Sequence, residues 1–325
     1  MIEIQELCKY YGQSRAVGPV SATIEKGEVV GLLGLNGAGK TTTLRVLACD
    51  LLPSSGTVRV QGLDVVERPE EVRRKIGYLS DRPPLYDEMR VREYLQFAFE
   101  LRGKSAADGR KRVPEVAERV GLTRVLDEPL FSLSHGYRQR VGIAQAVVHD
   151  PELVVLDEPI SGLDPVQIVE MRALVRQLRT DHTVIVSSHI LSEISETCDR
   201  LLVLRDGVIV ASGTEEELSQ SLLEGIRIEL TVRADSADLS RILSVIRAIP
   251  DISTAGAISA LERGHKVQSF GIQAKKDVRE QLGASLQQAG FPLLTLARTE
   301  SELEDVFLKL AGGDVPARRE KTEAS

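Results

Sequence analysis

Tryptophan is absent from this sequence, and aromatic residues make up only 4% of its 325 positions. The interior must therefore be built mainly from aliphatic side chains, which dominate the 42% of residues that are hydrophobic. Valine-, isoleucine- and leucine-rich runs without polar alternation are typical of parallel strands that are covered on both faces. A chain of this length favours two domains over one.

Further shortages exclude other classes of protein. Cysteine occurs only at positions 8, 49 and 198, so no pair has zinc or redox spacing, and a reduced cytosolic setting is the simplest interpretation. The net charge is −7, whereas general nucleic-acid binders carry a basic face, so we expect no nucleic-acid partner. No apolar run approaches the roughly 20 residues of a membrane span. The first residues lack a signal-peptide pattern, and we expect a chain that does not itself cross a membrane.

Short apolar segments alternate with amphipathic ones from residue 1 to about 220, which predicts an α/β domain with a mainly parallel sheet. The predicted strands are Ile2–Leu7, Val29–Leu33, Ile76–Leu79, Leu153–Leu156, Thr183–Val186 and Leu201–Leu204. The predicted helices are Lys40–Cys49, Val91–Leu101, Gly109–Val120, Gly136–His149, Val166–Arg179 and Ile190–Cys198. Strict alternation in "GTVRVQG" and in the first 30 residues predicts a small antiparallel subsheet beside it.

The pattern changes after about residue 223. "RIELTV", "DLSRILSVIRAI", "ISTAGAIS", "KVQSFGIQA", "VREQLGASLQQAG" and "LLTLAR" predict the ferredoxin-like order β-α-β-β-α-β. A closing helix is predicted over Glu302–Leu310, and the polar tail after it is predicted to be disordered. We therefore predict a first domain over residues 1–222, a small α+β accessory domain over 223–311 and a tail over 312–325.

The stretch "GLNGAGKTT" lies between a predicted strand and a predicted helix. Gly34, Gly39, Lys40 and Thr41 match G-x-x-x-x-G-K-[ST]. Glycines let a backbone curl round a polyphosphate, and the helix that follows presents free N–H groups and its positive dipole end. We expect Lys40 to reach the β and γ phosphates and Thr41 to ligate Mg²⁺. Other loop residues expected to bind the nucleotide are Asn36, Gly37, Ala38 and Thr42. The flanking strand and helix disfavour an ordinary glycine-rich turn.

The apolar strand "LVVLDEP" ends in Asp157 and Glu158. Ligands of open α/β sheets gather beyond the carboxyl ends of strands. We expect Asp157 to hold Mg²⁺ through water, and Glu158 to orient or deprotonate the attacking water. His189 ends a second apolar strand, "TVIVSSH", and would contact the γ-phosphate from the same edge. Taken alone, His189 is more simply a helix-capping residue.

A second helix start of interest lies in "LSHGYRQRVGIAQAVVHD". Ser134 is a typical N-cap, and Val141, Ala144 and Val148 mark one helical face. The serine hydroxyl, the Gly136 amide and the helix dipole would together form a second anion-binding end. An ordinary capping serine is the simpler explanation when this stretch is considered alone.

The stretches "GLNGAGKTT", "LSHGYRQR", "LVVLDEP", "SGLDP" and "SSH", in this order, resemble the ATP-binding subunit of an ABC transporter over about residues 2–220. The resemblance implies a P-loop NTPase core of ABC type with an antiparallel β-subdomain and a helical subdomain. It implies ATP and Mg²⁺ as cofactors and a head-to-tail dimer, in which the signature helix of one copy completes the ATP site of the other. It also implies an integral membrane permease as a separate partner, which would place the chain on the inner face of the cell membrane.

The resemblance assigns roles to individual residues. Tyr11 matches the aromatic residue that stacks on adenine, with Tyr10 as a neighbouring alternative. Asp164 matches the acid that communicates across the dimer, and before a proline it also suits an N-cap. The remaining assignments are the phosphate loop (Gly37, Gly39, Lys40, Thr41, Thr42), the signature serine and second glycine acting in trans (Ser134, Gly136), the magnesium-side acid and catalytic base (Asp157, Glu158) and the switch histidine (His189).

Three positions depart from the family pattern. Asp81 stands where the family usually has glutamine, and its oxygen can still ligate Mg²⁺ or position water. His135 replaces the first signature glycine; near a phosphate, its protonation would tune ATP affinity, and an affinity independent of pH between about 5.5 and 7.5 would exclude this. Ile160 replaces the usual threonine after "DEP".

Two branch features complete the interpretation. "SELEDVFLKLAGG" resembles the closing helix of cassettes that serve ABC-2-type exporters, and the signature region is similar to the gliding-motility and multidrug branch. We therefore predict an ATP-hydrolysing subunit that drives a separate permease for export, with a regulatory or assembly role for the accessory domain. One alternative is a soluble ABC ATPase acting on a ribosome or DNA, which the single phosphate loop and acidic balance disfavour. A non-hydrolysing ATP-gated scaffold is disfavoured by the intact Glu158 and His189.

Overall fold

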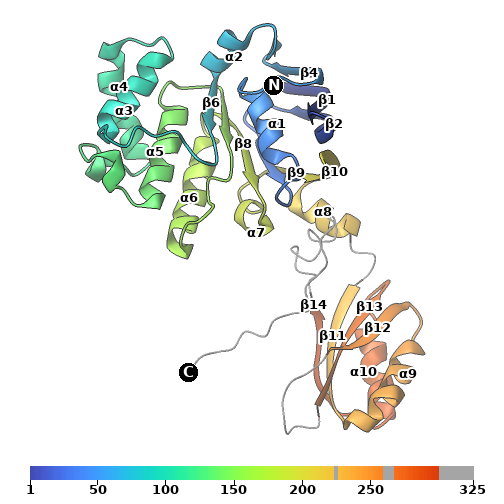
Figure 1. The fold of residues 1–325 in the computed structure, drawn as a ribbon. Helices are drawn as coiled ribbons and strands as arrows, with labels where there is room; N and C mark the ends of the chain where they lie inside the picture. The colour runs from blue at the N-terminus through green and yellow to red at the C-terminus, as the bar shows by residue number, and fades with distance from the viewer. Residues whose placement is uncertain (223–225, 259–266, 300–325) are drawn as a thin grey trace. The chain divides into compact units, whose positions relative to one another are not determined.

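The computed structural model describes residues 1–222, 226–258 and 267–299. Residues 1–215 pack as one compact unit and a second unit begins at Glu216, so the division falls at the start of α8 (Glu215–Leu222). Figure 1 shows both units. The predicted closing helix and the predicted tail lie outside the described residues.

A six-stranded sheet forms the centre of the first unit, in the order β10-β9-β3-β8-β7-β6. Its strands are parallel except β10, which runs antiparallel to β9. Every residue of β3, β7 and β8 is buried, as the unbroken apolar runs predicted. The bounds are β3 (Val29–Leu33), β6 (Ile76–Leu79), β7 (Leu153–Leu156), β8 (Thr183–Ser188), β9 (Arg200–Arg205) and β10 (Val208–Gly213).

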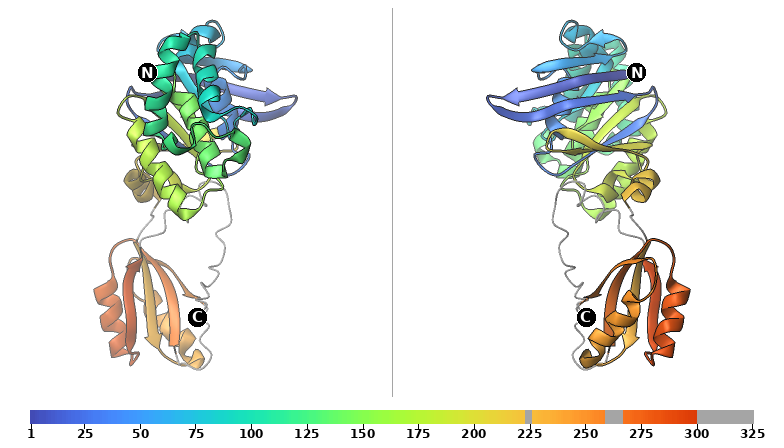
Figure 2. Two further views of the ribbon diagram at one scale, coloured as in Figure 1. Left: turned by 90° about the vertical axis from the view of Figure 1, so that its left-hand side faces the viewer. Right: turned by 90° about the vertical axis from the view of Figure 1, so that its right-hand side faces the viewer.

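The predicted antiparallel subsheet is confirmed, in the order β2-β1-β4-β5 (Figure 2). It consists of β1 (Ile2–Tyr11), β2 (Ser14–Ile24), β4 (Ser55–Val60) and β5 (Leu63–Asp64). Helix α1 (Lys40–Leu47) shares one aliphatic core with both sheets, to which Leu44 of the helix, Ile4 of β1 and Val30 of β3 all belong. This core fixes the start of α1 at the end of β3.

A group of helices follows β6. In Figure 1, α3 (Val91–Leu101), α4 (Ala106–Arg119) and α5 (His135–Val147) lie together beside the sheet. Helix α5 packs directly on β6, since a Cβ added at Gly77 would lie 1.9 Å from the carbonyl oxygen of Ala146. The remaining elements are α2 (Pro69–Lys75), the short 3-10 helices η1 (Thr123–Val125) and η2 (Leu130–Ser132), α6 (Pro165–Leu178) and α7 (Leu191–Ile194).

Two predicted helices differ from those observed. The helix predicted from Gly109 begins earlier, at Ala106, because the Ser105 hydroxyl accepts a hydrogen bond from the Asp108 amide. The helix predicted over Ile190–Cys198 is only one turn long. After Ile194 the hydrogen-bond spacing shortens, because the Thr197 amide donates to the Ile194 carbonyl three residues back.

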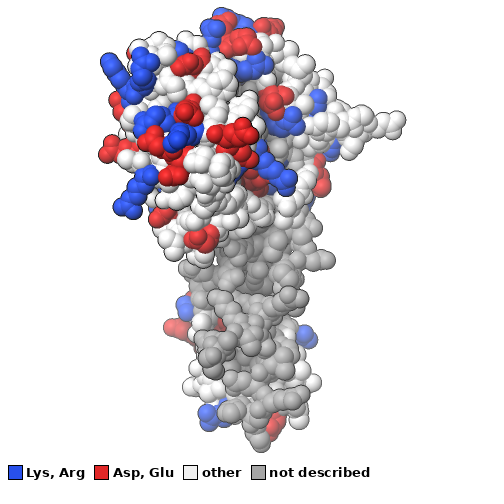
Figure 3. Space-filling model, turned by 60° about the vertical axis from the view of Figure 1, so that its left-hand side comes forward, with Lys and Arg blue, Asp and Glu red and all other residues white. Residues whose placement is uncertain are grey.

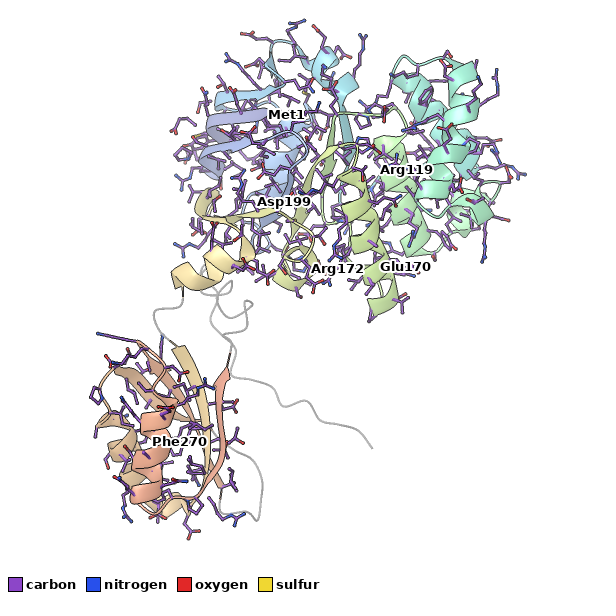
Figure 4. All side chains as sticks on the ribbon, turned by 180° about the vertical axis from the view of Figure 1, so that it is seen from behind. Met1, Arg119, Glu170, Arg172, Asp199 and Phe270 are labelled. Atoms are coloured by element: carbon purple, nitrogen blue, oxygen red, sulfur yellow. The ribbon has the colours of Figure 1, made fainter. Side chains whose placement is uncertain are left out.

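The second unit has the predicted β-α-β-β-α-β order, and its antiparallel sheet runs β12-β13-β11-β14. Its elements are β11 (Ile226–Arg233), α9 (Leu239–Arg247), β12 (Ile252–Ile258), β13 (Val267–Ala274), α10 (Arg279–Gln288), β14 (Leu293–Thr299) and the 3-10 helix η3 (Ser236–Asp238). Phe270, labelled in Figure 4, is fully buried between this sheet and the helix residues Ile242 and Leu282. No helix within the described ranges is long and apolar enough to span a membrane.

Candidate functional site

The phosphate loop joins the buried strand β3 to α1. The Gly34 amide bonds to the Ser188 carbonyl (3.3 Å), which ties the start of the loop to the end of β8. Gly39, the N-cap of α1, has a φ of +101° and offers no side chain to cap the helix. The first N–H groups of α1 thus remain available to an anion, as the sequence pattern predicts.

Lys40, Glu158 and His189 form one cluster at the carboxyl ends of the strands, in which Lys40 and Glu158 are buried and His189 is half-buried. The Lys40 ammonium donates to the Gly34 carbonyl (2.8 Å) and lies 3.1 Å from Glu158 Oε1. The other Glu158 oxygen lies 2.9 Å from His189 Nδ1. The Lys40 and Glu158 side chains are only 5% and 11% exposed, so their interaction is little screened by solvent. A phosphate entering the site would compete with Glu158 for the ammonium.

Asp157 lies deeper than Glu158. Its Oδ1 accepts a hydrogen bond from the Ser187 hydroxyl (2.6 Å), and the same hydroxyl accepts from the Glu158 amide (2.9 Å). Its Oδ2 is buried and has no hydrogen-bond partner within the described residues. Burial raises the pKa of Asp157, while hydrogen bonds with Ser187 and Thr41 partly oppose the shift. Ser187 organises both carboxyl residues, a role that sequence reasoning missed although "SSH" contains it.

These residues fit a Mg²⁺ ion that shares its ligands with a nucleotide. Mg²⁺ favours one or two carboxylates together with phosphate oxygens and water. The unpartnered Oδ2 of Asp157 is such a ligand, the Thr41 hydroxyl lies beside it, and Asp81 is near enough to influence its pKa. Among residues 1–222, 226–258 and 267–299, no cluster of three or more His, Cys, Asp or Glu could hold a metal ion unaided.

A cavity of about 480 Å³ opens in front of this cluster. We call it the Lys40 cavity. The predicted residues that line it are Asn36, Gly37, Gly39, Lys40, Thr41, Thr42, Asp81, Glu158 and His189. Ala16 of β2 and Ser161 also line it and were not predicted. The size suits a small-molecule ligand, and the lining suits a phosphate.

Seven other predicted residues lie outside the cavity lining, and four of them, Gly34, Asp157, Ala38 and Tyr11, belong to the elements around it. Gly34 and Asp157 are behind it, and Ala38 belongs to the core of the two sheets. Tyr11 ends β1 with its ring 49% exposed and 5.5 Å from the Lys9 ammonium. Tyr10 is 44% exposed, so the structure leaves both tyrosines accessible to a base.

A second, larger groove of about 1190 Å³ contains Ser134, Gly136 and Asp164. Ser134 caps α5 by accepting from the Tyr137 amide (3.5 Å), and Asp164 caps α6 by accepting from the Val166 and Gln167 amides (3.0 and 2.9 Å). Arg119 of α4 and Glu170 of α6, labelled in Figure 4, line the same groove. We call residues 134–136 the signature end. It does not line the Lys40 cavity of its own chain.

The fold and this site define a P-loop nucleotide-binding protein of the α/β class. Residues 17–161 match the family model described as ABC transporter. The chain is 32% identical to the bacitracin transport ATP-binding protein BcrA of Enterococcus faecalis, over 96% of this chain and 97% of that protein. This chain belongs to the family of ABC transporter ATP-binding subunits, as the motifs predicted, which favours that interpretation over a ribosome- or DNA-directed ATPase.

Other relatives agree with this assignment. The daunorubicin/doxorubicin resistance ATP-binding protein DrrA of Streptomyces peucetius is 34% identical over 99% of this chain and 95% of its own length. A solved structure titled as the ATP-binding subunit of an ABC transporter is 30% identical, with a TM-score of 0.62 over 68% of this chain and 92% of that one. The dimeric cassette MJ0796 is 26% identical, with a TM-score of 0.61 over 66% of this chain and 98% of that one.

Proposed function

We propose that this chain hydrolyses ATP in a head-to-tail dimer and thereby drives a separate membrane permease that exports its substrate. The observation that carries the proposal is the position of Glu158, whose carboxylate is held between the Lys40 ammonium and the His189 imidazole at the Lys40 cavity. A carboxylate in this place can accept a proton from water that attacks a terminal phosphate.

Each neighbour of Glu158 has a distinct task in this mechanism. Lys40 would release Glu158 and bind the β and γ phosphates, which leaves the carboxylate free to orient water. His189 would contact the γ-phosphate through Nε2, the ring nitrogen that does not contact Glu158. Thr41 and Asp157, with Asp81 nearby, would hold Mg²⁺, which neutralises charge on the phosphate oxygens when bound. The Gly37 and Gly39 amides and the α1 dipole would cradle the phosphates.

The dimer is proposed because the signature end does not line the Lys40 cavity of its own chain. Ser134 and Gly136 line a groove of their own, together with Asp164. A second copy in head-to-tail orientation would bring its Ser134 hydroxyl and its Gly136 amide to the nucleotide. The related cassette MJ0796 is described as dimeric, which supports the same arrangement here.

A third groove, of about 510 Å³, suits the proposed permease. Tyr86 and Leu101 line it and are 57% and 68% exposed, and Phe97, which also lines it, lies edge-on to the Tyr86 ring. Arg73 and Arg74 of α2 line the same groove. We propose that a cytosolic segment of the permease with acidic and apolar side chains binds here. Export is proposed because near-full-length relatives are named for bacitracin transport and for daunorubicin/doxorubicin resistance.

Phosphate release by the purified full-length chain tests this function. With Mg²⁺ present, Glu158→Gln is expected to lower the hydrolysis rate about 10³-fold, because a general base contributes roughly 10²–10⁴-fold. The same variant should accumulate as an ATP-bound dimer in light scattering. Glu152→Gln is the matched control, because Glu152 precedes β7 at its opposite end, where it pairs with Lys75.

Addition of Ser134→Arg to the Glu158→Gln chain should prevent dimer formation while ATP binding is retained. Hydrolysis at the native rate by Glu158→Gln would remove the base assignment. A Glu158→Gln chain that stays monomeric in saturating ATP, both alone and with its membrane partner, would remove the dimer.

A further inference from the structure

His135, the first residue of α5, extends from the helix toward the loop that lines the Lys40 cavity. Its Nε2 atom lies 3.0 Å from the carbonyl oxygen of Ser161. A carbonyl oxygen can only accept, so Nε2 must carry the hydrogen in this contact. Ser161 is also one of the residues that line the Lys40 cavity. A single imidazole therefore connects the signature end to the wall of the chain's own nucleotide cavity.

The signature end is packed closely at two points, against the loop and against α6. Gly162 has a φ of +74°, and a Cβ added to it would lie 3.2 Å from His135 Nε2. A side chain at residue 162 would crowd the imidazole and would require a conformation that L-residues rarely adopt. One residue along α5, a Cβ added to Gly136 would lie 2.5 Å from Oε1 of Gln167 in α6.

The same loop begins at the proposed catalytic base. Glu158 has a φ of +50°, an uncommon value for a residue other than glycine. The Ser161 amide bonds back to the Glu158 carbonyl (3.2 Å), which closes a turn between them. Asp164 ends the loop by capping α6. A shift of the Glu158 backbone would therefore move the Ser161 carbonyl to which His135 is bonded.

We propose that His135 is a positioning residue that couples the two nucleotide sites of the dimer. It would transmit the position of the Glu158–Ser161 turn at one site to the Ser134 hydroxyl and the Gly136 amide that act at the other. This inference rests on the proposed function, because it requires the head-to-tail dimer. A glycine at residue 135 has no side chain that could make this contact, so the coupling route would be a property of chains with a donor there.

The test is the dependence of hydrolysis on MgATP concentration in the full-length chain. Coupling between two sites is a shared free energy and appears as cooperativity. We expect a Hill coefficient above about 1.5 for the native chain and about 1 for His135→Leu, which fills similar space without a donor. His135→Gln keeps an N–H donor of similar reach and should retain most of the cooperativity. A merely structural role of the side chain would not separate these two variants.

Gly162→Ala supplies a second route to the same answer, because it crowds the imidazole from the loop side. It should lower the Hill coefficient, and its combination with His135→Leu should add little. Midpoints of thermal unfolding for each variant identify any that fail to fold, and a cooperative, folded Gly162→Ala chain would count against the proposal.

Three further outcomes would overturn the coupling role. They are equal cooperativity in native and His135→Leu chains, equal losses in the Leu and Gln variants, and weaker ATP affinity with the Hill coefficient retained, which would place the imidazole at the phosphate instead. A native chain that hydrolyses ATP as a dimer with a Hill coefficient of about 1 would remove this inference and leave the proposed function intact. A native chain that neither hydrolyses ATP nor dimerises would remove the proposed function itself.

Discussion

The two ends of β7 and β8 bury different polar groups: carboxyl groups beside an ammonium at one end, and imidazoles at the other. At the carboxyl ends, Asp157 and Glu158 are buried beside Lys40, and one oxygen of Asp157 lacks a protein partner. At the amino ends, His149 and His182 are each 2% exposed, and each donates one hydrogen bond, to the Ile76 and Pro151 carbonyls respectively. The second ring nitrogen of each is buried without a hydrogen-bond partner among the described residues.

The difference separates a ligand site from a structural one. Burial lowers the pKa of both imidazoles, so protonation of either one would lower the stability of the fold. The carboxyl end instead buries two carboxyl groups and an ammonium, which is costly unless each has a partner. A phosphate and a cation can supply that partner. On the face drawn in Figure 3, basic and acidic side chains are interspersed, so buried charge distinguishes the site better than surface charge does.

Loss of the Lys40 ammonium at the carboxyl ends of the strands should have the largest effect on nucleotide binding. Lys40→Met is expected to weaken MgATP binding by about 100-fold, since one charge-assisted contact to phosphate contributes roughly 1.5–3 kcal/mol. It also leaves Glu158 without its ammonium partner. Titration with a fluorescent ATP analogue measures the affinity, and Lys26→Met, which changes an exposed lysine near the amino end of β3, is the control. Native affinity in Lys40→Met would separate the cavity from nucleotide binding.

Low pH should lower the stability of the fold through His149 and His182, at the amino ends of β7 and β8. Burial, with Arg102 nearby, lowers the pKa of His149 to about 4, below an unfolded value of about 6.5. The folded state therefore binds this proton less tightly than the unfolded state. Stability is complete above about pH 6.5 and falls by about 1.4 kcal/mol per pH unit below it, until the folded pKa is reached. The lowered pKa of His182 acts in the same direction.

Urea unfolding at pH 7.5 and 5.0 measures this loss, which we expect to be about 2 kcal/mol from His149 alone. His149→Gln can still donate to the Ile76 carbonyl but cannot ionise, so its stability should depend less on pH. Parallel pH profiles for the native and Gln chains would show that His149 is not the titrating group.

Asp157→Asn should give the smallest of these changes in free energy. The sign of its effect on stability is the informative result. Asparagine keeps an oxygen that can accept from Ser187 but removes a buried charge, so the chain should become more stable by about 1 kcal/mol near neutral pH. The stabilisation that MgATP gives to the native chain, measured as a shift in the midpoint of thermal unfolding, should largely disappear. An Asp157→Asn chain that is less stable than the native chain would show that the carboxylate is already well satisfied.

Much of this arrangement was predictable because it depends on local pattern. Unbroken apolar runs predicted β3, β7 and β8, and the phosphate loop follows from glycine spacing and the helix after it. Long-range contacts were not predictable in this way. Ser187 bonds to Asp157 across two neighbouring strands, and Ala16 reaches the cavity from the antiparallel sheet. No periodicity in the sequence encodes either contact.

The contact between β6 and α5 has a mechanical consequence. The backbone of the helix rests on Gly77 without an intervening side chain, and Gly142 of the helix in turn allows Leu79 and Pro83 to approach. We therefore expect β6 and α5 to move as one unit. Because Asp81 lies two residues beyond β6, a ligand that moves Asp81 would change the position of α5 without contacting the helix.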